Sequence, residues 1–353
     1  MRLAPILSYL FLPFSILYGG IMSVRNFLYD RKYIKAYEAQ VPIISVGNIS
    51  MGGTGKTPMA EYLIHHFDAK GIKVAYLSRG YGRKTKGYYA VEIEKGDATK
   101  YGDEALQLAR KFPQIPVAVC EDRSTGVRKL VQQKVEPIIL DDAFQHRKLA
   151  RDLDIVLIDV NRLPYQDFVL PSGSLREPLR GIKRADMLII NKLKSPSQIA
   201  KIDQKLSKWG KMMAFAKVVQ GDVLPFTKTE PILSISESKE KEVILFSGIG
   251  NADFFEDQMR EAGWKIKVHL KFGDHHDFTS KDLERLLTFA EKDHIFICTE
   301  KDYCRLSGNT TFLQLKQEPF YYIPIQLEFL SGEQGLLDML GELNLNTTQD
   351  RAS

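Results

Sequence analysis

Cysteine is scarce in this chain, and neither metal-binding nor disulfide chemistry is expected from it. Only Cys120, Cys298 and Cys304 occur among 353 residues, and their spacing matches no metal motif. They are therefore expected to be reduced, mostly buried thiols of a cytosolic protein, without a zinc site. A large excess of one charge is also missing: the net charge of +5 is too small to indicate nucleic-acid binding by itself. It fits anionic lipid or a phosphorylated substrate equally well.

Charged residues are missing altogether from Leu3 to Val24, where the sequence is overwhelmingly apolar. About 20 such residues can cross a bilayer core as a helix, although Pro5 and Pro13 would kink it. We predict a kinked membrane anchor with a basic collar over residues 1–40, lying in or dipping into the inner leaflet. A buried core helix and a cleaved signal peptide are the alternatives, and the latter lacks a small-x-small cleavage pattern. The collar that suits a cytoplasmic lipid surface comprises Arg25, Arg31, Lys32 and Lys35.

The length and the pattern of the remaining sequence favour two α/β units. Apolar strands alternate with amphipathic helices, as in a parallel sheet covered on both faces. We predict a P-loop NTPase-type core over 41–222, a linker over 223–240 and a smaller α/β/α domain over 241–345. Core strands are expected at 42–48, 74–78, 117–120, 136–142, 154–160 and 185–191, and core helices at 56–70, 103–112, 124–133 and 196–209. Strands of the smaller domain are expected near 242–247, 265–272, 294–298 and 321–328.

The strongest motif is GNISMGGTGKT at 47–57, which follows a β-branched strand and opens a helix. Its glycines allow backbone N–H groups to point at phosphate oxygens. Lys56 would lie against the β- and γ-phosphates, and the Thr57 hydroxyl would bind Mg²⁺. Ser50 replaces the usual first glycine, which is acceptable if its φ is negative. The predicted nucleotide-binding residues are Gly52, Gly53, Thr54, Gly55, Lys56 and Thr57.

Asp141 and Asp142 follow the apolar run PIIL, which is the layout of a second magnesium-binding motif. Adjacent residues of a strand point to opposite sides, so only one of the two is expected to touch the metal directly. Which one does so stays open, and a structural pair of aspartates that caps the strand is the alternative.

A phosphate loop can belong to a kinase, a GTPase switch or a motor, so the phosphate acceptor must be inferred from other residues. Guanine recognition is not expected, because Lys194 stands where the motif at 191–194 needs aspartate. A kinase needs a carboxylate that receives the hydroxyl proton. Asp103 and Glu104 begin a predicted helix, where carboxylates are also favoured in any protein. In FGDHHDF, His275 or its neighbour His276 could orient such a carboxylate, or both could be surface residues.

The motifs GNISMGGTGKTP, SRGYGRK, GDE, LDDAFQH, GSLREP and F-x-DHH occur in this order. In this series, which extends to TEKD at 299–302, the chain resembles the tetraacyldisaccharide 4′-kinases of lipid A (lipopolysaccharide) biosynthesis. The resemblance implies an enzyme that uses ATP and Mg²⁺ to phosphorylate the 4′-hydroxyl of a tetraacyldisaccharide 1-phosphate, giving lipid IV A. It also implies work at the cytoplasmic face of the bacterial inner membrane, and two α/β/α domains joined by a two-stranded linker.

Residue roles follow from the same resemblance. It implies that Asp103 is the base, that His275 is its partner from the other domain, and that Lys56 acts in catalysis. It assigns magnesium to Thr57, Asp141, Asp142 and Glu104. Placing the base and its histidine on separate domains implies hinge closure on ATP. Substrate contacts are implied for Arg79, Tyr81, Arg123, Gln145 and Arg176, with His146 lining the same site; an arginine paired with a structural carboxylate is the alternative for each arginine.

Two further functions stay open from the sequence: a regulatory P-loop NTPase that acts on a membrane partner, and a non-enzymatic membrane scaffold. The expected partners are the acylated disaccharide 1-phosphate and membrane lipids. Neither nucleic acid nor an obligate protein partner is expected. Basic residues at 83–86 and 176–184 could meet the substrate 1-phosphate or lipid headgroups, or form a solvated charged face.

Overall fold

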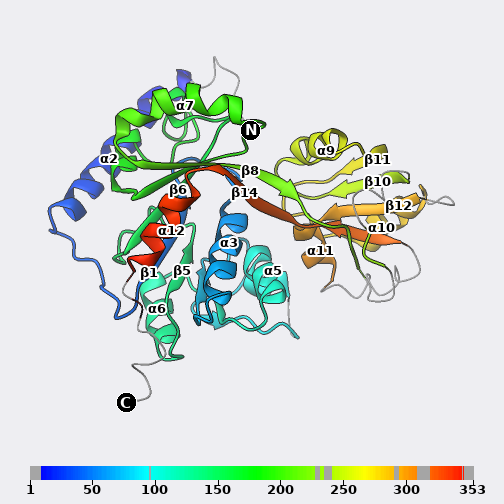
Figure 1. Ribbon diagram of the computed structural model, residues 1–353, viewed down its shortest axis with the longest axis horizontal. Helices are drawn as coiled ribbons and strands as arrows, with labels where there is room; N and C mark the ends of the chain where they lie inside the picture. Colours follow the sequence, from blue (N-terminus) through cyan, green and yellow to red (C-terminus); the bar gives the residue numbers. More distant parts are fainter. Residues whose placement is uncertain are drawn as a thin grey trace.

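The computed structural model describes residues 9–94, 97–226, 231–233, 241–289, 294–307, 319–343 and 345. Two sheets, one of nine strands and one of five, form the cores of two domains. The domains lie side by side along the longest axis of the molecule, with helices packed on their sheets (Figure 1). The α/β fold class and the presence of a second, smaller domain are therefore confirmed.

The larger sheet is parallel except at its two edge strands, β14 and β3, which are antiparallel to their neighbours. Parallel strands place their carboxyl ends at one edge, so the loops that follow β1, β2, β5 and β7 converge there. Every predicted core strand is present to within a few residues. In sheet order, the strands are β14 (Ile325–Ser331), β8 (Met212–Gln220), β7 (Met187–Asn191), β6 (Leu153–Asp159), β1 (Ile43–Asn48), β5 (Ile138–Asp141), β2 (Ala75–Ser78), β4 (Val117–Val119) and β3 (Tyr89–Ala90).

Apolar residues of the central strands alternate between the two faces of this sheet, because successive side chains point in opposite directions. Ile44 packs with α3 and α5, whereas Ile43 packs with α6 on the opposite face. Burial on both faces explains why the strands read as continuous apolar runs. The helices of this domain are α3 (Lys56–Asp68), α4 (Ala98–Tyr101), α5 (Asp103–Lys111), α6 (Arg123–Val131) and α7 (Ile199–Leu206), with short 3₁₀ turns at Pro164–Gln166, Leu179–Arg184, Pro196–Gln198 and Ser207–Trp209.

The smaller sheet has the order β11-β10-β12-β13-β9. Of the predicted linker, residues 227–230 and 234–240 lie outside the described residues, and Leu224–Pro225 pairs with β13 as strand β9. The three cysteines are free and buried, as predicted. The strands are β9 (Leu224–Pro225), β10 (Glu242–Ser247), β11 (Lys265–Lys271), β12 (His294–Thr299) and β13 (Phe320–Ile323), and the helices are α9 (Ala252–Glu261), α10 (Ser280–Leu287) and α11 (Glu300–Leu306).

The chain returns to the larger domain after β13, which corrects the predicted boundary of 241–345. The single strand expected at 321–328 is two strands, because Pro324 interrupts the row of N–H donors between β13 and β14. Strand β14 pairs with β8, and the two cross together from one domain to the other (Figure 1). Helix α12 (Glu333–Gly341) then packs against the larger core. Strands β8 and β14 thus form the two-stranded connection that the family resemblance implied.

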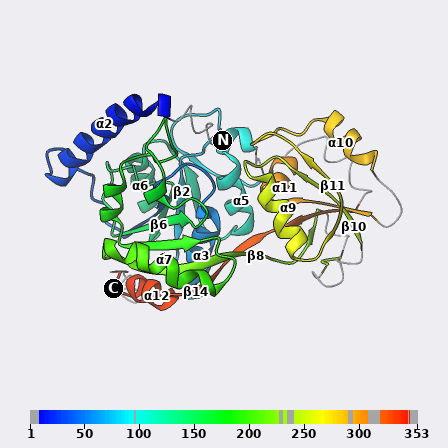
Figure 2. The same ribbon diagram turned by 90° about the horizontal axis from the view of Figure 1, so that it is seen from above.

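Helix α2 (Leu12–Asp30) lies along the outside of the larger domain (Figure 2). Ser15 Oγ donates to Ser172 Oγ at 2.8 Å, and the Tyr18 hydroxyl donates to the Arg176 carbonyl at 3.0 Å. Only Ser15 is buried within α2, so the alternative of a buried core helix is wrong. The opposite side exposes large apolar side chains, namely Phe14, Ile16, Leu17, Ile21, Val24 and Phe27.

The predicted N-terminal membrane helix is not supported. None of the helices in the described residues has both the length and the apolar character needed to span a bilayer. The helix starts later than the apolar run and continues through Arg25 and Asn26 to Asp30, so its last turns carry charged and polar side chains. Asn26 Nδ2 donates to Glu177 Oε2 at 2.8 Å, which fixes one side of this part of the helix to the protein.

Replacing Leu336 by alanine tests the reassignment of the C-terminal segment. Leu336 is fully buried in the larger core, so we expect its removal to lower the free energy of unfolding by about 2–5 kcal/mol. Hydrogen exchange should show the loss in the larger sheet and leave β10 and β12 protected. Gln334→Ala, on the exposed side of α12, is the control. Loss of protection confined to the smaller sheet would contradict this assignment.

Candidate active site

Two buried asparagines hold the phosphate loop between β1 and α3. At the end of β1, Asn48 Nδ2 donates to the Gly52 carbonyl at 3.3 Å and to Thr54 Oγ1 at 3.1 Å. At the end of β7, Asn191 Nδ2 donates to the Thr54 carbonyl at 3.0 Å. The loop is therefore fixed by the ends of two strands. In the sequence, Asn191 stands out only as part of an incomplete guanine motif, and nothing there indicates this contact.

Glycine is required at two positions of the loop. Gly52 has a φ of 108° and Gly55 a φ of 95°, a region that favours glycine. A Cβ on Gly55 would lie 2.1 Å from Asn191 Nδ2, whereas a Cβ on Gly53 would meet nothing within 4 Å. Ser50 is not among the residues with positive φ, so the condition for its replacing glycine is met. Helix α3 begins directly afterwards, and its N-terminal N–H groups suit phosphate oxygens.

Lys56, Asp142 and Arg176 meet beside the loop. Lys56 Nζ lies 3.7 Å from Asp142 Oδ1, and Arg176 Nη1 lies 2.6 Å from the same oxygen. Burial opposes ionisation of Asp142, but the two cations outweigh it and hold its pKa below the usual value. The structure thus brings together three residues that the sequence assigned separately to nucleotide, metal and substrate.

Asp141 is the last residue of β5 and is almost completely buried. Ser78 Oγ donates weakly to its Oδ2 at 3.4 Å, and its Oδ1 is buried without a hydrogen-bond partner. Burial, and next the negative charge of Glu104, raise the pKa of Asp141 to about 7. An unbonded buried carboxylate oxygen is costly unless a cation or donor approaches it. This oxygen therefore fits a position for a metal ligand.

Protein side chains alone do not make a metal cage here. Across the described ranges, no three His, Cys, Asp or Glu side chains are grouped closely enough to hold an ion. Magnesium usually takes one or two carboxylates together with substrate phosphates and water. Asp141, Asp142 and the buried Thr57 at the start of α3 match that donor set.

Asp103 and His275 join the two domains. Asp103 begins α5 of the larger domain, and His275 lies after β11 in the smaller one. Asp103 Oδ2 and His275 Nδ1 are 2.8 Å apart, and this hydrogen bond raises the pKa of His275. His276 instead bonds to Asp282 at 3.0 Å, so His275 is the histidine that reaches Asp103. Tyr81 is 70% exposed, and its ring centroid lies 5.5 Å from that of His275.

Glu104 has a different partner from the one that the sequence suggested. Lys301 Nζ, from the TEKD stretch at the start of α11, lies 2.6 Å from Glu104 Oε1. The positive charge of Lys301 is the largest cause that lowers the pKa of Glu104 to about 2. One oxygen of this predicted metal ligand is therefore bonded to the smaller domain. Arg305, one helical turn further on, lies 3.6 Å from Asp103 Oδ2.

Two predicted substrate contacts are structural in this arrangement. Arg123 is 2% exposed and donates to the carbonyls of Cys120 and Asp141 at 2.9 and 3.0 Å. A buried guanidinium needs such partners, and here they fix the ends of β4 and β5. Gln145 Nε2 donates to the Asn48 carbonyl at 2.9 Å and to Glu177 Oε1 at 3.0 Å. Its amide N–H donors thus support the phosphate loop instead of facing a ligand.

Other predicted residues lie around the rim or behind the site. Arg79 is exposed at the end of β2. Burial lowers the pKa of His146 to about 4, and its Nε2 has no hydrogen-bond partner. Lys301 and Arg305 were missed, although T-x-x-D at 299–302 is a recognisable helix start.

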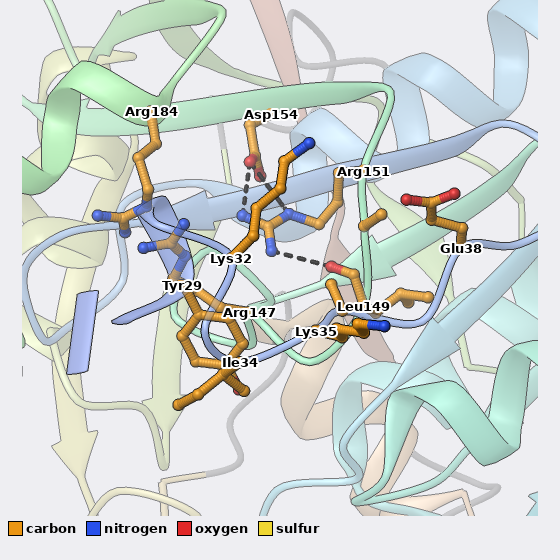
Figure 3. Close-up of a pocket in the computed structure, with 12 residues that line it drawn as sticks. Tyr29, Lys32, Ile34, Lys35, Glu38, Arg147, Leu149, Arg151, Asp154 and Arg184 are labelled. Carbon is orange, nitrogen blue, oxygen red and sulfur yellow. Dashed lines mark hydrogen bonds and ion pairs between the residues drawn. The ribbon is translucent and has the colours of Figure 1, made fainter. Parts of the chain in front are cut away.

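A cavity of about 610 Å³ lies away from this site, at the basic collar that follows α2 (Figure 3). Asp154, which lines the cavity, is near the amino end of β6, so the cavity is at the sheet edge opposite the phosphate loop. Its carboxylate is bonded to Arg151 at 2.7 Å. Arg147 and Arg184 are likewise paired, with Asp30 and Glu177. The lining arginines are therefore held by protein carboxylates.

Comparison with known proteins gives a consistent picture. The family model described as tetraacyldisaccharide-1-P 4′-kinase matches residues 7–344. Tetraacyldisaccharide 4′-kinase of Chlorobaculum parvum is 37% identical over 338 residues, covering 93% of both chains. That of Flavobacterium johnsoniae is 39% identical, covering 91% of this chain and 93% of its own. The crystal structure of LpxK from Aquifex aeolicus in complex with ATP is 33% identical, with a TM-score of 0.72 and coverage of 95% and 98%.

Gly55→Ala tests the conformation of the phosphate loop. We expect a large loss of ATP affinity, because the new Cβ would collide with Asn191 at a residue whose φ is already unfavourable for alanine. Gly53→Ala keeps the same N–H group and places its Cβ in open space, so it serves as the matched control. Calorimetric titration with ATP distinguishes the two variants. Equal affinities would show that the loop binds in another conformation.

Proposed function

The chain belongs to the tetraacyldisaccharide-1-P 4′-kinase family, and we propose that it transfers the γ-phosphate of ATP to the 4′-hydroxyl of a tetraacyldisaccharide 1-phosphate in lipid A biosynthesis. The observation that carries the proposal is the Asp103–His275 hydrogen bond, made across the two domains. The phosphate loop is close by, because, besides Lys301, the charges of Lys56 and of His275 both help to lower the pKa of the adjacent Glu104. A regulatory NTPase needs the loop but has no use for a base that the second domain orients.

Nucleotide binding is assigned to the loop and to Lys56. Backbone N–H groups of 52–57 surround the terminal phosphates, and Lys56 moves from Asp142 to a phosphate oxygen. Arg176 remains on Asp142 at 2.6 Å, so that carboxylate stays ionised when the lysine leaves it. Asp141, Asp142 and Thr57 would hold Mg²⁺, which supplies charge neutralisation at the phosphates. Positioning and neutralisation are most of what phosphoryl transfer requires of a protein.

Asp103 accepts the proton of the 4′-hydroxyl while the 4′-oxygen forms a bond to the γ-phosphorus and ADP leaves with the bridging oxygen. His275 orients the carboxylate through Oδ2, so that Oδ1 can face the acceptor. Because the hydrogen bond to Asp103 raises the pKa of His275, a protonated imidazole is favoured beside this carboxylate. Asp103 is buried, so the proton is transferred out of contact with bulk water.

Asp103→Asn should keep ATP affinity and lose transfer. The amide preserves size but cannot accept the proton, so we expect kcat to fall by about 10²–10⁴-fold. The assay follows labelled phosphate from ATP into detergent-dispersed tetraacyldisaccharide 1-phosphate. Asp253→Asn, in the exposed first turn of α9, is the control. Unchanged transfer in Asp103→Asn removes this residue as the base, and wild-type release of label only as free phosphate supports the regulatory NTPase.

The same protein is proposed to work at the cytoplasmic face of the bacterial inner membrane. An acceptor with four acyl chains stays in a bilayer, whereas ATP is cytosolic, so the site must lie at the membrane surface. Two features support this location: the exposed apolar side of α2, a helix on the outside of the larger domain (Figure 2), and the basic collar that begins within α2 and continues after it. A helix of this kind lies in the interface plane rather than spanning the bilayer.

Charge placed on the exposed side of α2 should release the protein from membranes. Leu17 and Ile21 are 65% and 59% exposed, so Leu17→Asp with Ile21→Asp removes apolar contact without disturbing the core. Ile232→Asp makes the same change at a side chain that is 63% exposed on the smaller domain. Sedimentation with phosphatidylglycerol vesicles measures the difference. Equal sedimentation of both variants would mean that α2 does not bind the lipid.

A further inference from the structure

One side of α5 carries the polar side chains by which this helix contacts the described residues of the smaller domain. Besides Asp103 and Glu104, Gln107 Nε2 donates to Glu300 Oε2 at 2.8 Å, and Arg110 donates to the Cys304 carbonyl at 2.8 Å. Lys111 Nζ lies 3.4 Å from the same Glu300 oxygen. These positions are spaced by three and four residues, so they face the same way. The contact of α5 with α11 is thus made largely by polar side chains, unlike either apolar core.

Helix α11 and the His275 loop are joined into one unit by Asp302. This fully buried carboxylate accepts from the Gly248 N–H at 2.9 Å and pairs with Arg305 at 2.8 Å. The Gly248 carbonyl in turn accepts from the His275 N–H at 3.0 Å. Any movement of the smaller domain therefore carries His275, Lys301 and Arg305 together toward the first turn of α5.

We propose that Lys301 is a positioning residue for phosphoryl transfer: it bonds Glu104 when the domains close, and thereby fixes the first turn of α5 so that the adjacent Asp103 meets His275. This proposal rests on the proposed function. The bond is short, at 2.6 Å, and charge-assisted hydrogen bonds of this kind are among the stronger polar contacts. Lys301 and Arg305 are four residues apart on α11, so the helix presents one cation to each carboxylate of the GDE motif.

His275 alone is not enough to hold this geometry, because its side chain is 40% exposed and lies on a loop. The Lys301 and Glu104 side chains are 33% and 27% exposed, and they are attached to two helices. A more exposed interdomain ion pair offers a direct comparison. Lys194 Nζ lies 2.7 Å from Glu261 Oε1, but these side chains are 69% and 60% exposed and remote from the first turn of α5. Exposed pairs of this kind contribute little.

The experiment compares Lys301→Met, Lys301→Arg and the control Lys194→Met in the full-length protein. Small-angle scattering with and without a non-hydrolysable ATP analogue measures closure, and the lipid assay measures kcat and KM. Lys301→Met should stay open in the presence of the analogue. Its kcat should fall about 10²-fold, the scale expected for a misplaced catalytic group, and its KM for ATP should be unchanged. Lys301→Arg keeps the charge and should restore closure and most of kcat. Lys194→Met should match the wild type.

Three results would overturn the proposal: normal closure in Lys301→Met, a Lys301→Arg variant as inactive as Lys301→Met, or an equal loss in Lys194→Met. If Lys301→Met does not fold, Lys301→Arg is the deciding variant. It keeps the positive charge, so a failure of this variant to close on the analogue would also overturn the proposal. A wild-type protein that closes on the analogue but transfers nothing to lipid would refute the proposed function instead. The scattering comparison then still decides whether Lys301 controls closure.

Discussion

The hydrogen bond between Asp103 and His275 constrains the whole molecule, because its two partners belong to domains with separate apolar cores. Strands β8 and β14 join these domains at one end, and α5 meets α11 at the other. The two domains are connected covalently on one side and by a polar contact on the other. They can therefore move apart at the polar contact without exposing either apolar core. The proposed base therefore meets its histidine only when the polar contact forms, so the proposed chemistry depends on the domain arrangement.

Charge balance explains why the carboxylates of the site behave differently. Asp142 lies between Lys56 and Arg176, and Glu104 faces Lys301, so the pKa of each is lowered despite burial. Asp141 is more deeply buried, and the only cation bonded to it among the described residues, Arg123, contacts its backbone carbonyl; burial, and next the charge of Glu104, therefore raise its pKa. Asp142 and Glu104, whose negative charges are balanced by cations, both bond to side chains from outside their own strand or helix. The remaining one keeps a free oxygen toward the site.

Local features could be predicted from the sequence, and features set by tertiary contacts could not. The strands up to 191 and the loop at 47–57 follow from runs of apolar residues and from glycine conformation, which act within a few residues. The return of β14 to the larger sheet depends on pairing with β8, about a hundred residues earlier, and Pro324 gave its only local signal. Arg123 carries no sign of burial, because an arginine that bonds carbonyls looks the same in sequence as one that binds phosphate. The contact of Lys301 with Glu104 could not be predicted, because it depends on how the smaller domain is placed against the larger one.

Helix α2 lies against the larger domain near the site. Its contacts connect the proposed lipid-binding surface to the phosphate loop. Its exposed side is apolar, whereas its inner side bonds to the Arg176 carbonyl and to Glu177. Arg176 holds Asp142, and Glu177 holds Gln145, whose amide supports the strand end before the phosphate loop. The segment around 176–177 thus contacts the proposed membrane-facing helix on one side and the phosphate site on the other. Because these contacts all lie within α2 and the larger domain, the distance between the proposed lipid-binding side of α2 and the phosphate loop is set by this domain alone.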